Sequence, residues 1–118
     1  MTRTNEIALI KHANEMREEL DRRSLEIDQQ GYLPQDLACQ LSARGFYRLI
    51  VPESLGGLGV SPETFCKICE SLGSANGSAA WCVFIGSTSQ YLFGALPRPQ
   101  LERMLVDPNV ITLSLIHI

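Results

Sequence analysis

The sequence predicts an all-α domain of four to five helices, followed by the beginning of a strand. Apolar residues recur at helical spacing in several segments, and residues that typically start or end helices stand between these segments. Near the end, Val110-Ile111-Thr112-Leu113 has the β-branched content of a strand, but the chain offers no second strand to pair with it. Because a lone strand leaves backbone groups unpaired, we expect the chain to be truncated at the first strand of a β domain.

The N-terminal part is predicted to form one long amphipathic helix and one short helix. In the long helix, apolar side chains alternate with charged ones at helical spacing, at Leu9, Ala13, Met16, Leu20 and Ile27. Gly31 is placed to end this helix, and Pro34 stands where the first turn of the next helix would begin. Gly45 closes the short helix. The apolar face of the short helix consists of Leu37, Ala38 and Leu41.

The middle of the chain predicts a loop and a third helix. Residues 46–60 are expected to start extended and then to become a glycine-rich loop. Ser61-Pro62-Glu63 is a strong helix start, because it combines a hydroxyl cap, a proline at the first position and an acid in the first turn. An apolar stripe at helical spacing follows, made of Phe65, Ile68, Cys69 and Leu72. Residues 73–77 are expected to break the helix.

The C-terminal part predicts two more helices. The fourth should cover residues 78–93, and it is apolar nearly all round over residues 79–85, so we expect it to be central and buried. Pro97 and Pro99 separate it from a fifth helix. The apolar residues of the fifth helix are Leu101, Met104 and Leu105. Asp107-Pro108-Asn109 then predicts a turn before the strand.

Composition and charge exclude several classes of protein. The 118 residues are 45% hydrophobic and 19% charged, and the net charge of −3 gives no basic field to attract nucleic acid or anionic lipid. The N-terminus has no apolar run typical of a signal peptide, and polar residues 87–90 interrupt the most apolar stretch, so no membrane span is predicted. We therefore expect a cytoplasmic protein with reduced thiols at Cys39, Cys66, Cys69 and Cys82.

Three motifs suggest chemistry but have simpler explanations. Cys66-Lys67-Ile68-Cys69 could be a redox pair or half a zinc site, yet it lies inside a predicted helix and has no second CxxC, so we expect no bound metal. Gly56-Gly57-Leu58-Gly59 lacks the spacing of a phosphate-binding loop, and a tight turn explains its glycines. His12 and His117 have no evident nucleophile and acid beside them. No catalytic residue is assigned.

The most informative segment covers residues 81–91 of the fourth helix. Trp81, Ile85 and Ser89 are spaced at i, i+4 and i+8, which predicts one shared face. Residues 87–90 add hydroxyl groups and the amide of Gln90 to a helix whose first half is expected to be buried. These groups could bond back to the helix carbonyls or line the polar end of a ligand cavity, and the residues alone leave both interpretations open.

Several segments, in their order and spacing, resemble the acyl-CoA dehydrogenase family over about residues 15–113. Residues 52–61, Pro-Glu-Ser-Leu-Gly-Gly-Leu-Gly-Val-Ser, resemble the family's P-E-x-x-G-G-x-G-x-S segment and follow a short helix that ends before Gly45-Phe46. Residues 69–73 look like its E-x-L-A/G helix. Residues 76–81 look like its D-G-S-x-x-W helix start, with Asn76 in place of the usual aspartate. Residues 107–111 resemble the D-P-x-x-V/I segment that leads into the family's β domain.

The resemblance implies a flavoprotein of three parts, of which this chain holds the N-terminal helical domain at residues 1–109 and the start of the β domain at residues 110–113. Residues 114–118 resemble translated sequencing-adapter read-through and are expected to be a non-native tail. The implied cofactor is FAD or FMN, bound mostly by the absent β domain and C-terminal helical bundle, so no cofactor-binding residue is assigned. Because the equivalent family helix helps to wall the substrate cavity, we predict that Trp81, Ser89 and Gln90 belong to the substrate pocket.

Three functions remain open, with dehydrogenation placed first. The first is CH–CH dehydrogenation of a small-molecule acyl thioester such as an acyl-CoA by a flavin-dependent oxidoreductase. The second is the oxygenase component of a two-component flavin monooxygenase, the branch that the segments most resemble. Ser89 stands where that branch often has a histidine, and serine is no base at neutral pH, which weakens this interpretation. The third is a non-enzymatic helical interaction module.

The enzymatic hypotheses carry expectations about partners. We expect a homo-oligomer at full length and either a flavin reductase or an electron-transfer protein as partner. Neither nucleic acid nor a membrane is expected to bind. The chain alone should be inactive, because the family's catalytic groups and main flavin contacts lie beyond it.

Overall fold

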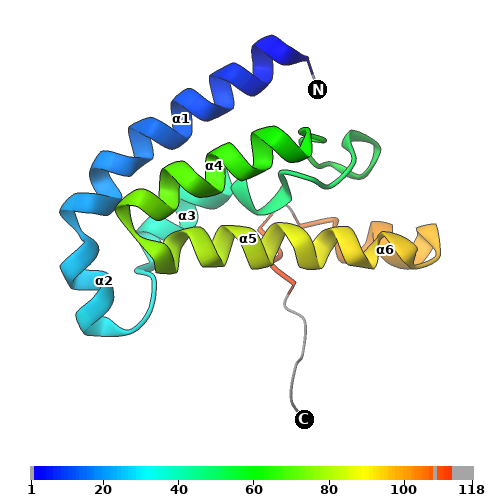
Figure 1. The fold of residues 1–118 in the computed structure, drawn as a ribbon. Helices are drawn as coiled ribbons and strands as arrows, with labels where there is room; N and C mark the ends of the chain where they lie inside the picture. The colour runs from blue at the N-terminus through cyan, green and yellow to red at the C-terminus, as the bar shows by residue number, and fades with distance from the viewer. Residues whose placement is uncertain (1, 108, 113–118) are drawn as a thin grey trace.

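The computed structural model describes residues 2–107 and 109–112, which form an array of helices (Figure 1). The α-helices are α1 (Arg3–Arg22), α2 (Ser24–Gln30), α3 (Gln35–Ala43), α4 (Pro62–Ala75), α5 (Gly77–Leu92) and α6 (Arg98–Met104). Short 3-10 turns are η1 (Phe46–Arg48), η2 (Glu53–Leu55) and η3 (Phe93–Ala95). No described residue lies in a strand, so the predicted all-α class is confirmed for this part of the chain.

The core forms where α4 packs between α1 and α5 (Figure 1). The predicted stripes of α1 and α4 both face it, and α3 and η1 close it from the other side. Its fully buried side chains include Ala13, Leu20, Leu37, Leu41, Phe46, Leu49, Ile68, Leu72 and Val83, each with 0% exposure. Helical periodicity in the sequence therefore identified most of the core correctly.

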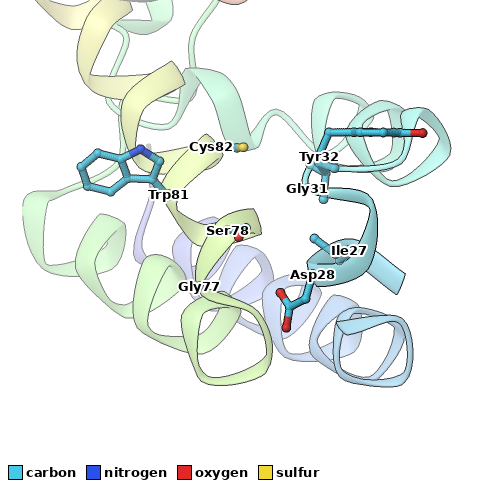
Figure 2. A pocket seen from close by; sticks show the side chains of 9 residues that line it. Ile27, Asp28, Gly31, Tyr32, Gly77, Ser78, Trp81 and Cys82 are labelled. Atoms are coloured by element: carbon cyan, nitrogen blue, oxygen red, sulfur yellow. The ribbon is translucent and has the colours of Figure 1, made fainter. Parts of the chain in front are cut away.

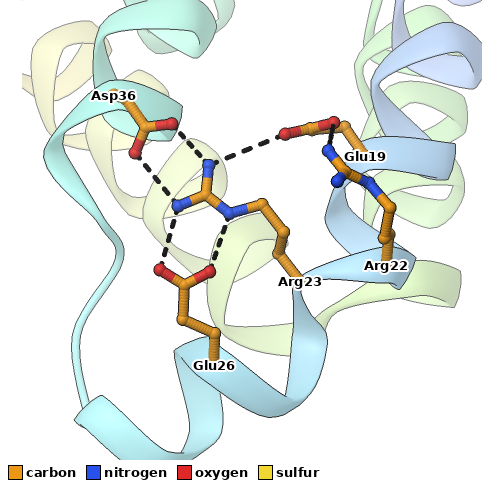
Figure 3. Close-up of polar contacts among 5 residues, drawn as sticks. All are labelled: Glu19, Arg22, Arg23, Glu26 and Asp36. Carbon is orange, nitrogen blue, oxygen red and sulfur yellow. Dashed lines mark hydrogen bonds and ion pairs between the residues drawn. The ribbon is translucent and has the colours of Figure 1, made fainter.

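The predicted first helix is in fact two helices. The helix is interrupted at Arg23, whose backbone angles are φ −102° and ψ 8°. The guanidinium of Arg23 contacts Glu26, with Nε 2.8 Å from the carboxylate, and also pairs with Asp36 of α3 and with Glu19 (Figure 3). The hydrogen bonds from Arg23 hold the pKa of the Asp36 carboxyl below its ordinary value. The prediction of a single long helix was therefore wrong. The apolar residues keep their helical spacing across Arg23, so the sequence pattern does not reveal the break that these ion pairs accompany.

Two local predictions around α4 also need correction. Residues 46–48 are not extended but form η1, which buries Phe46 and Tyr47. The expected break over residues 73–77 narrows to Asn76, which ends α4 and caps α5. The side-chain oxygen of Asn76 accepts a hydrogen bond from the Ala79 amide at 2.9 Å, and its amide nitrogen donates to Ser24 at 3.0 Å. A single capping side chain therefore joins the two helices.

Helix α5 is not buried on all sides. The face toward α4 and η1 is buried. On this face Ala79, Val83 and Ser87 have 0% exposure, and Gly86 is also buried. Trp81 is 63% exposed and Phe84 39% exposed on the outer face. The prediction of a central helix is wrong within the described chain, because the other elements cover only one side of α5.

The segment after α6 lies against the helices through side-chain hydrogen bonds. Arg48 donates to the carbonyl of Leu105 at 3.2 Å and to that of Asp107 at 2.5 Å. Ser42 donates to Asn109 at 3.0 Å. Residues 110–112 follow an irregular path, and Leu113 and the expected tail at 114–118 lie outside the described residues. The strand and the domain boundaries therefore stay predictions.

Candidate functional site

The three predicted pocket residues all lie on α5, but the structure separates them. Trp81 is 63% exposed, whereas Ser89 and Gln90 are each 2% exposed. Gln90 lies nine positions after Trp81, which amounts to about two and a half helical turns and places the two side chains on opposite faces. Trp81 lines one hollow near the start of α5, Gln90 lines another near its end, and Ser89 lines neither. Their shared role in one pocket stays a prediction.

The hollow at the start of α5 has a volume of about 460 Å³ and lies between the first turns of α5 and the loop after α2 (Figure 2). It is lined by Ile27, Asp28, Gly31, Tyr32, Leu33, Gly77, Ser78, Trp81 and Cys82. In Figure 2 the rings of Trp81 and Tyr32 point away from each other, so they do not form an aromatic cage. Burial raises the pKa of the Cys82 thiol, which makes it a poor nucleophile at neutral pH.

Two hydroxyl groups of α5, those of Thr88 and Ser87, form hydrogen bonds within the fold. Thr88 donates to the carbonyl of Phe84 at 2.8 Å, one turn earlier, which is the back-bonding interpretation of these polar groups. Ser87 donates to the carbonyl of Phe46 at 2.8 Å and so attaches α5 to η1. A side chain at Gly86 would meet the ring of Tyr47 at 2.7 Å, so this contact also depends on glycine. The Ser87 hydroxyl therefore stabilises packing between α5 and η1, whereas the Thr88 hydroxyl bonds within α5.

Gln90 differs from these hydroxyl residues. Its amide nitrogen donates to the carbonyl of Val110 at 2.9 Å, but its side-chain oxygen is buried and has no hydrogen-bond partner. Gln90 also lines a hollow of about 440 Å³ at the C-terminal end of α5. The hollow is walled by Val51, Pro52, Leu55, Gln90, Tyr91, Leu92, Gly94 and Ala95. No charged residue is among these, so the hollow suits an uncharged, mostly apolar group.

The glycine-rich loop after η1 folds back on the chain before it. The amides of Leu58, Gly59 and Val60 donate to the carbonyls of Arg48, Val51 and Leu49 at 3.0, 2.9 and 2.9 Å. Gly56 has φ +81°, and a side chain at Gly57 would lie 2.0 Å from the Val51 oxygen. The tight-turn interpretation of the glycines is confirmed. Because these loop amides donate to carbonyls within the fold, they are not available to a phosphate.

Arg48 is the buried residue that sequence reasoning missed. It is 7% exposed, its terminal nitrogen binds two carbonyls of the segment after α6, and burial lowers the pKa of its guanidinium from the ordinary value. The signal available in the sequence was a lone arginine among the apolar residues 46–51. A charged residue in such a run needs hydrogen-bond partners, which here are carbonyls.

The cysteines and histidines form no reactive cluster in the described chain. Cys66 is exposed, and burial raises the pKa of the half-buried Cys69 thiol to about 11, with the neighbouring Cys66 contributing. Among the described residues, no three His, Cys, Asp or Glu side chains converge as metal ligands. His12 is exposed on α1, and His117 lies outside the described residues. Whether the cysteines bind metal stays a prediction.

Comparisons with known proteins agree with the helical architecture. The family model for the acyl-CoA dehydrogenase N-terminal domain matches residues 5–96. An indole-3-acetate monooxygenase from Acinetobacter baumannii is 38% identical over 87 residues, which cover 73% of this chain and 22% of that protein. One from Pseudomonas putida is 41% identical over 78 residues, which cover 65% of this chain and 20% of that protein.

A more distant relative completes the comparison. A pigment production hydroxylase from Rhodococcus erythropolis is 26% identical over 102 residues, which cover 86% of this chain and 26% of that protein. No solved structure gives a significant match. The chain thus spans between a fifth and about a quarter of the length of these curated relatives. In the part of the chain that the structure describes, no helix is long and apolar enough to cross a bilayer.

Proposed function

Because this chain belongs to the acyl-CoA dehydrogenase family through its N-terminal domain, we propose that it is the helical part of a flavin-dependent monooxygenase acting on a small molecule. The observation that carries the proposal is the set of relatives, which are named as monooxygenases and a hydroxylase. This reverses the order given by the sequence alone, where dehydrogenation came first. An aromatic acid, as in the names of the two more similar relatives, is the first substrate class to test.

The described residues do not fit a flavin site by themselves. The amides of residues 58–60 donate to nearby carbonyls, so the loop offers no cradle for a phosphate. Neither hollow beside α5 is lined by lysine or arginine, which would pair with a phosphate. FAD or FMN would therefore be held mainly by other parts of the full-length protein. In a monooxygenation, a reduced flavin held there would supply the two electrons with which molecular oxygen gives one atom to the substrate and the other to water.

The contribution of this chain would be to shape the substrate cavity. Trp81 and Gln90 border hollows at the two ends of α5, which supports a role for this helix as a cavity wall. Ser89 is 2% exposed and lies between them in the sequence. As a neutral hydroxyl it would orient or exclude groups rather than accept a proton. The proton-transfer groups of the reaction would come from the parts beyond this chain.

Dehydrogenation of an acyl thioester is the second candidate. Ser89 favours it, because this position offers no imidazole to exchange a proton with an oxygenated substrate. For this reaction a flavin in the full-length protein would serve as the hydride acceptor, and a base beyond this chain would take the neighbouring proton. The family match argues against the third hypothesis, a non-enzymatic interaction module.

One experiment on the full-length protein separates the two enzymatic candidates. The protein is supplied with reduced flavin from a flavin reductase, and oxygen uptake and hydroxylated product are measured with indole-3-acetate and related aromatic acids. In parallel, reduction of an artificial electron acceptor is measured with a series of acyl-CoA esters. We expect hydroxylated product that depends on reduced flavin, and no acceptor reduction. Acceptor reduction by an acyl-CoA without hydroxylation would replace the first candidate with the second.

The proposed enzyme also has expected partners. A flavin reductase would supply reduced flavin, and the full-length protein would be a homo-oligomer. We expect the 118-residue chain to retain little or no flavin after gel filtration, since its described residues offer no flavin site. A stoichiometric flavin spectrum retained by the chain would contradict this expectation.

A further inference from the structure

Helix α4 carries two thiols that the proposed function does not use. Cys66 and Cys69 both lie inside this helix, three positions apart, and neither forms a disulfide. Cys66 is exposed, and Cys69 is half-buried at the edge of the core. Inside a helix the neighbouring turns cover the backbone, so the exposed part of Cys69 belongs largely to a side chain of two heavy atoms. Both thiols therefore border the surface of α4.

The helical spacing places the two thiols next to each other. Residues three apart on a helix are surface neighbours, with Cβ atoms roughly 5–6 Å apart. Helical side chains also lean toward the N-terminus of the helix, which brings the Cys69 side chain over the turn that carries Cys66. The charge of a Cys66 thiolate, after burial, contributes to raising the pKa of the Cys69 thiol to about 11, in agreement with this proximity.

The pair is not arranged as a redox centre. A reactive cysteine needs a lowered pKa, whereas burial raises the pKa of Cys69. The ammonium of Lys67, which stands between the two cysteines, is paired with Glu63 at 2.6 Å, one turn earlier. A direct disulfide needs Cβ atoms about 3.5–4.5 Å apart, which is closer than neighbours on a regular helix. Forming that bond would therefore distort α4.

A single atom held between the two sulfurs fits this spacing better than a direct sulfur–sulfur bond. Thiols are soft ligands and favour soft, thiophilic centres. A structural zinc ion takes four ligands, but no three His, Cys, Asp or Glu side chains converge among the described residues. A trivalent arsenic atom with one bond to carbon takes two thiols and no further ligand. Its coordination therefore matches an isolated pair.

We propose that Cys66 and Cys69 form a dithiol site on α4 that binds a trivalent organoarsenical. When R–As=O binds, the two S–H bonds and the arsenic–oxygen bond break, and two S–As bonds form. The oxygen leaves with both protons as water, and neither arsenic nor sulfur changes its oxidation state. Because the protons leave with the water, the protonated Cys69 thiol is a competent partner. The site goes beyond the proposed function and does not rest on it.

Phenylarsine oxide is the probe that tests the site. It is titrated into the reduced 118-residue chain after the reductant has been removed. Intact-mass spectrometry counts the phenylarsenic groups bound, and a thiol reagent counts the thiols that remain. We expect one group bound and two thiols consumed per chain. An excess of 2,3-dimercaptopropanol should reverse the binding, whereas 2-mercaptoethanol at the same thiol concentration should not, since separate thiols lack the effective concentration of a linked pair.

Serine variants identify the thiols responsible. Cys66→Ser and Cys69→Ser each leave one thiol of the pair. We expect each to bind the probe roughly 100- to 10,000-fold more weakly, because the second S–As bond no longer forms within one molecule. The double variant Cys39→Ser, Cys82→Ser is the control, since these thiols lie on α3 and α5, and it should bind as the unchanged chain does. Far-UV circular dichroism of each variant checks that the helices are retained.

One further variant separates helical geometry from closeness in sequence. The double variant Cys66→Ser, Lys67→Cys keeps two thiols, now two positions apart, and puts them on different sides of α4. We expect it to bind at least about tenfold more weakly than the unchanged chain. Equal binding by this variant would overturn the proposed site, as would unchanged binding by Cys66→Ser or Cys69→Ser, or no binding by the unchanged chain. None of these measurements involves flavin or turnover, so the proposed monooxygenase function is tested separately.

Discussion

The two faces of α5 differ sharply in exposure. The inner face packs on α4 and η1, and Ala79 and Val83 there have 0% exposure. The outer face leaves Trp81 63% and Leu92 68% exposed, although residues 77–92 contain no charged side chain. By contrast, α1 buries its apolar stripe and turns charged residues outward. The comparison shows that α1 buries most of its apolar face within this chain, whereas α5 leaves large apolar side chains uncovered.

The largest expected effect comes from the packed side. Leu72 of α4 has 0% exposure in the core, so Leu72→Ala should lower the free energy of unfolding by about 2–5 kcal/mol. Chemical denaturation followed by circular dichroism measures the change. Leu25→Ala is the control, because Leu25 is 68% exposed and its replacement should change stability by less than about 0.5 kcal/mol. Similar losses in both variants would mean that the core is not packed as described.

A smaller effect is expected where the chain leaves the helices. Arg48→Met removes the hydrogen bonds to the carbonyls of Leu105 and Asp107 and should cost about 1–3 kcal/mol of stability. The segment over residues 105–112 should also become more sensitive to proteases. Limited proteolysis with mass spectrometry locates the cleavage sites. Arg103→Met, on the exposed side of α6, should leave the cleavage pattern unchanged.

The outer face of α5 should govern association rather than stability. We expect the chain to self-associate through its uncovered apolar side chains, and the double variant Trp81→Lys, Leu92→Lys to be mainly monomeric. Its free energy of unfolding should change by less than about 1 kcal/mol, because both side chains are mostly exposed. Size-exclusion chromatography with light scattering measures the mass. A sharp monomer peak for the unchanged chain would contradict the idea that α5 lacks a partner.

The smallest effect is expected at the contact between α1 and the start of α4. The Glu6 carboxylate accepts hydrogen bonds from the Ser61 amide at 2.7 Å and the Thr64 hydroxyl at 2.9 Å, which lower its pKa below the ordinary value of 4.5. Because the folded pKa is lower than the unfolded one, this stabilisation is present above pH 4.5 and is lost as the pH falls through the folded pKa.

The variant Glu6→Gln should therefore differ most from the unchanged chain near neutral pH and approach it in acid. Denaturation curves collected from pH 7 down to pH 3 test this dependence. Glu15→Gln, an exposed change on the same helix, serves as the control. A constant difference between Glu6→Gln and the unchanged chain across this range would show that the carboxylate charge does not matter.

The sequence by itself determined the helices whose apolar faces are buried within this chain. Ser61-Pro62-Glu63 begins α4 as predicted, with the Ser61 hydroxyl accepting from the Thr64 amide at 3.2 Å. Gly31 and Gly45 adopt positive φ angles of 73° and 76° at the ends of α2 and α3. Capping and glycine conformations depend on neighbours within a few residues, so they can be predicted from local sequence.

Only the tertiary structure decided which face of each helix is covered by other elements and where the candidate site residues lie. The break at Arg23 coincides with a pairing to Asp36, thirteen residues further along the chain, and the role of Arg48 depends on carbonyls beyond α6. The sequence placed Trp81, Ser89 and Gln90 on one helix, but only packing shows that Trp81 faces outward and Gln90 is buried against Val110. Helical spacing gives the angle between side chains, whereas burial depends on the elements that the chain brings against each face.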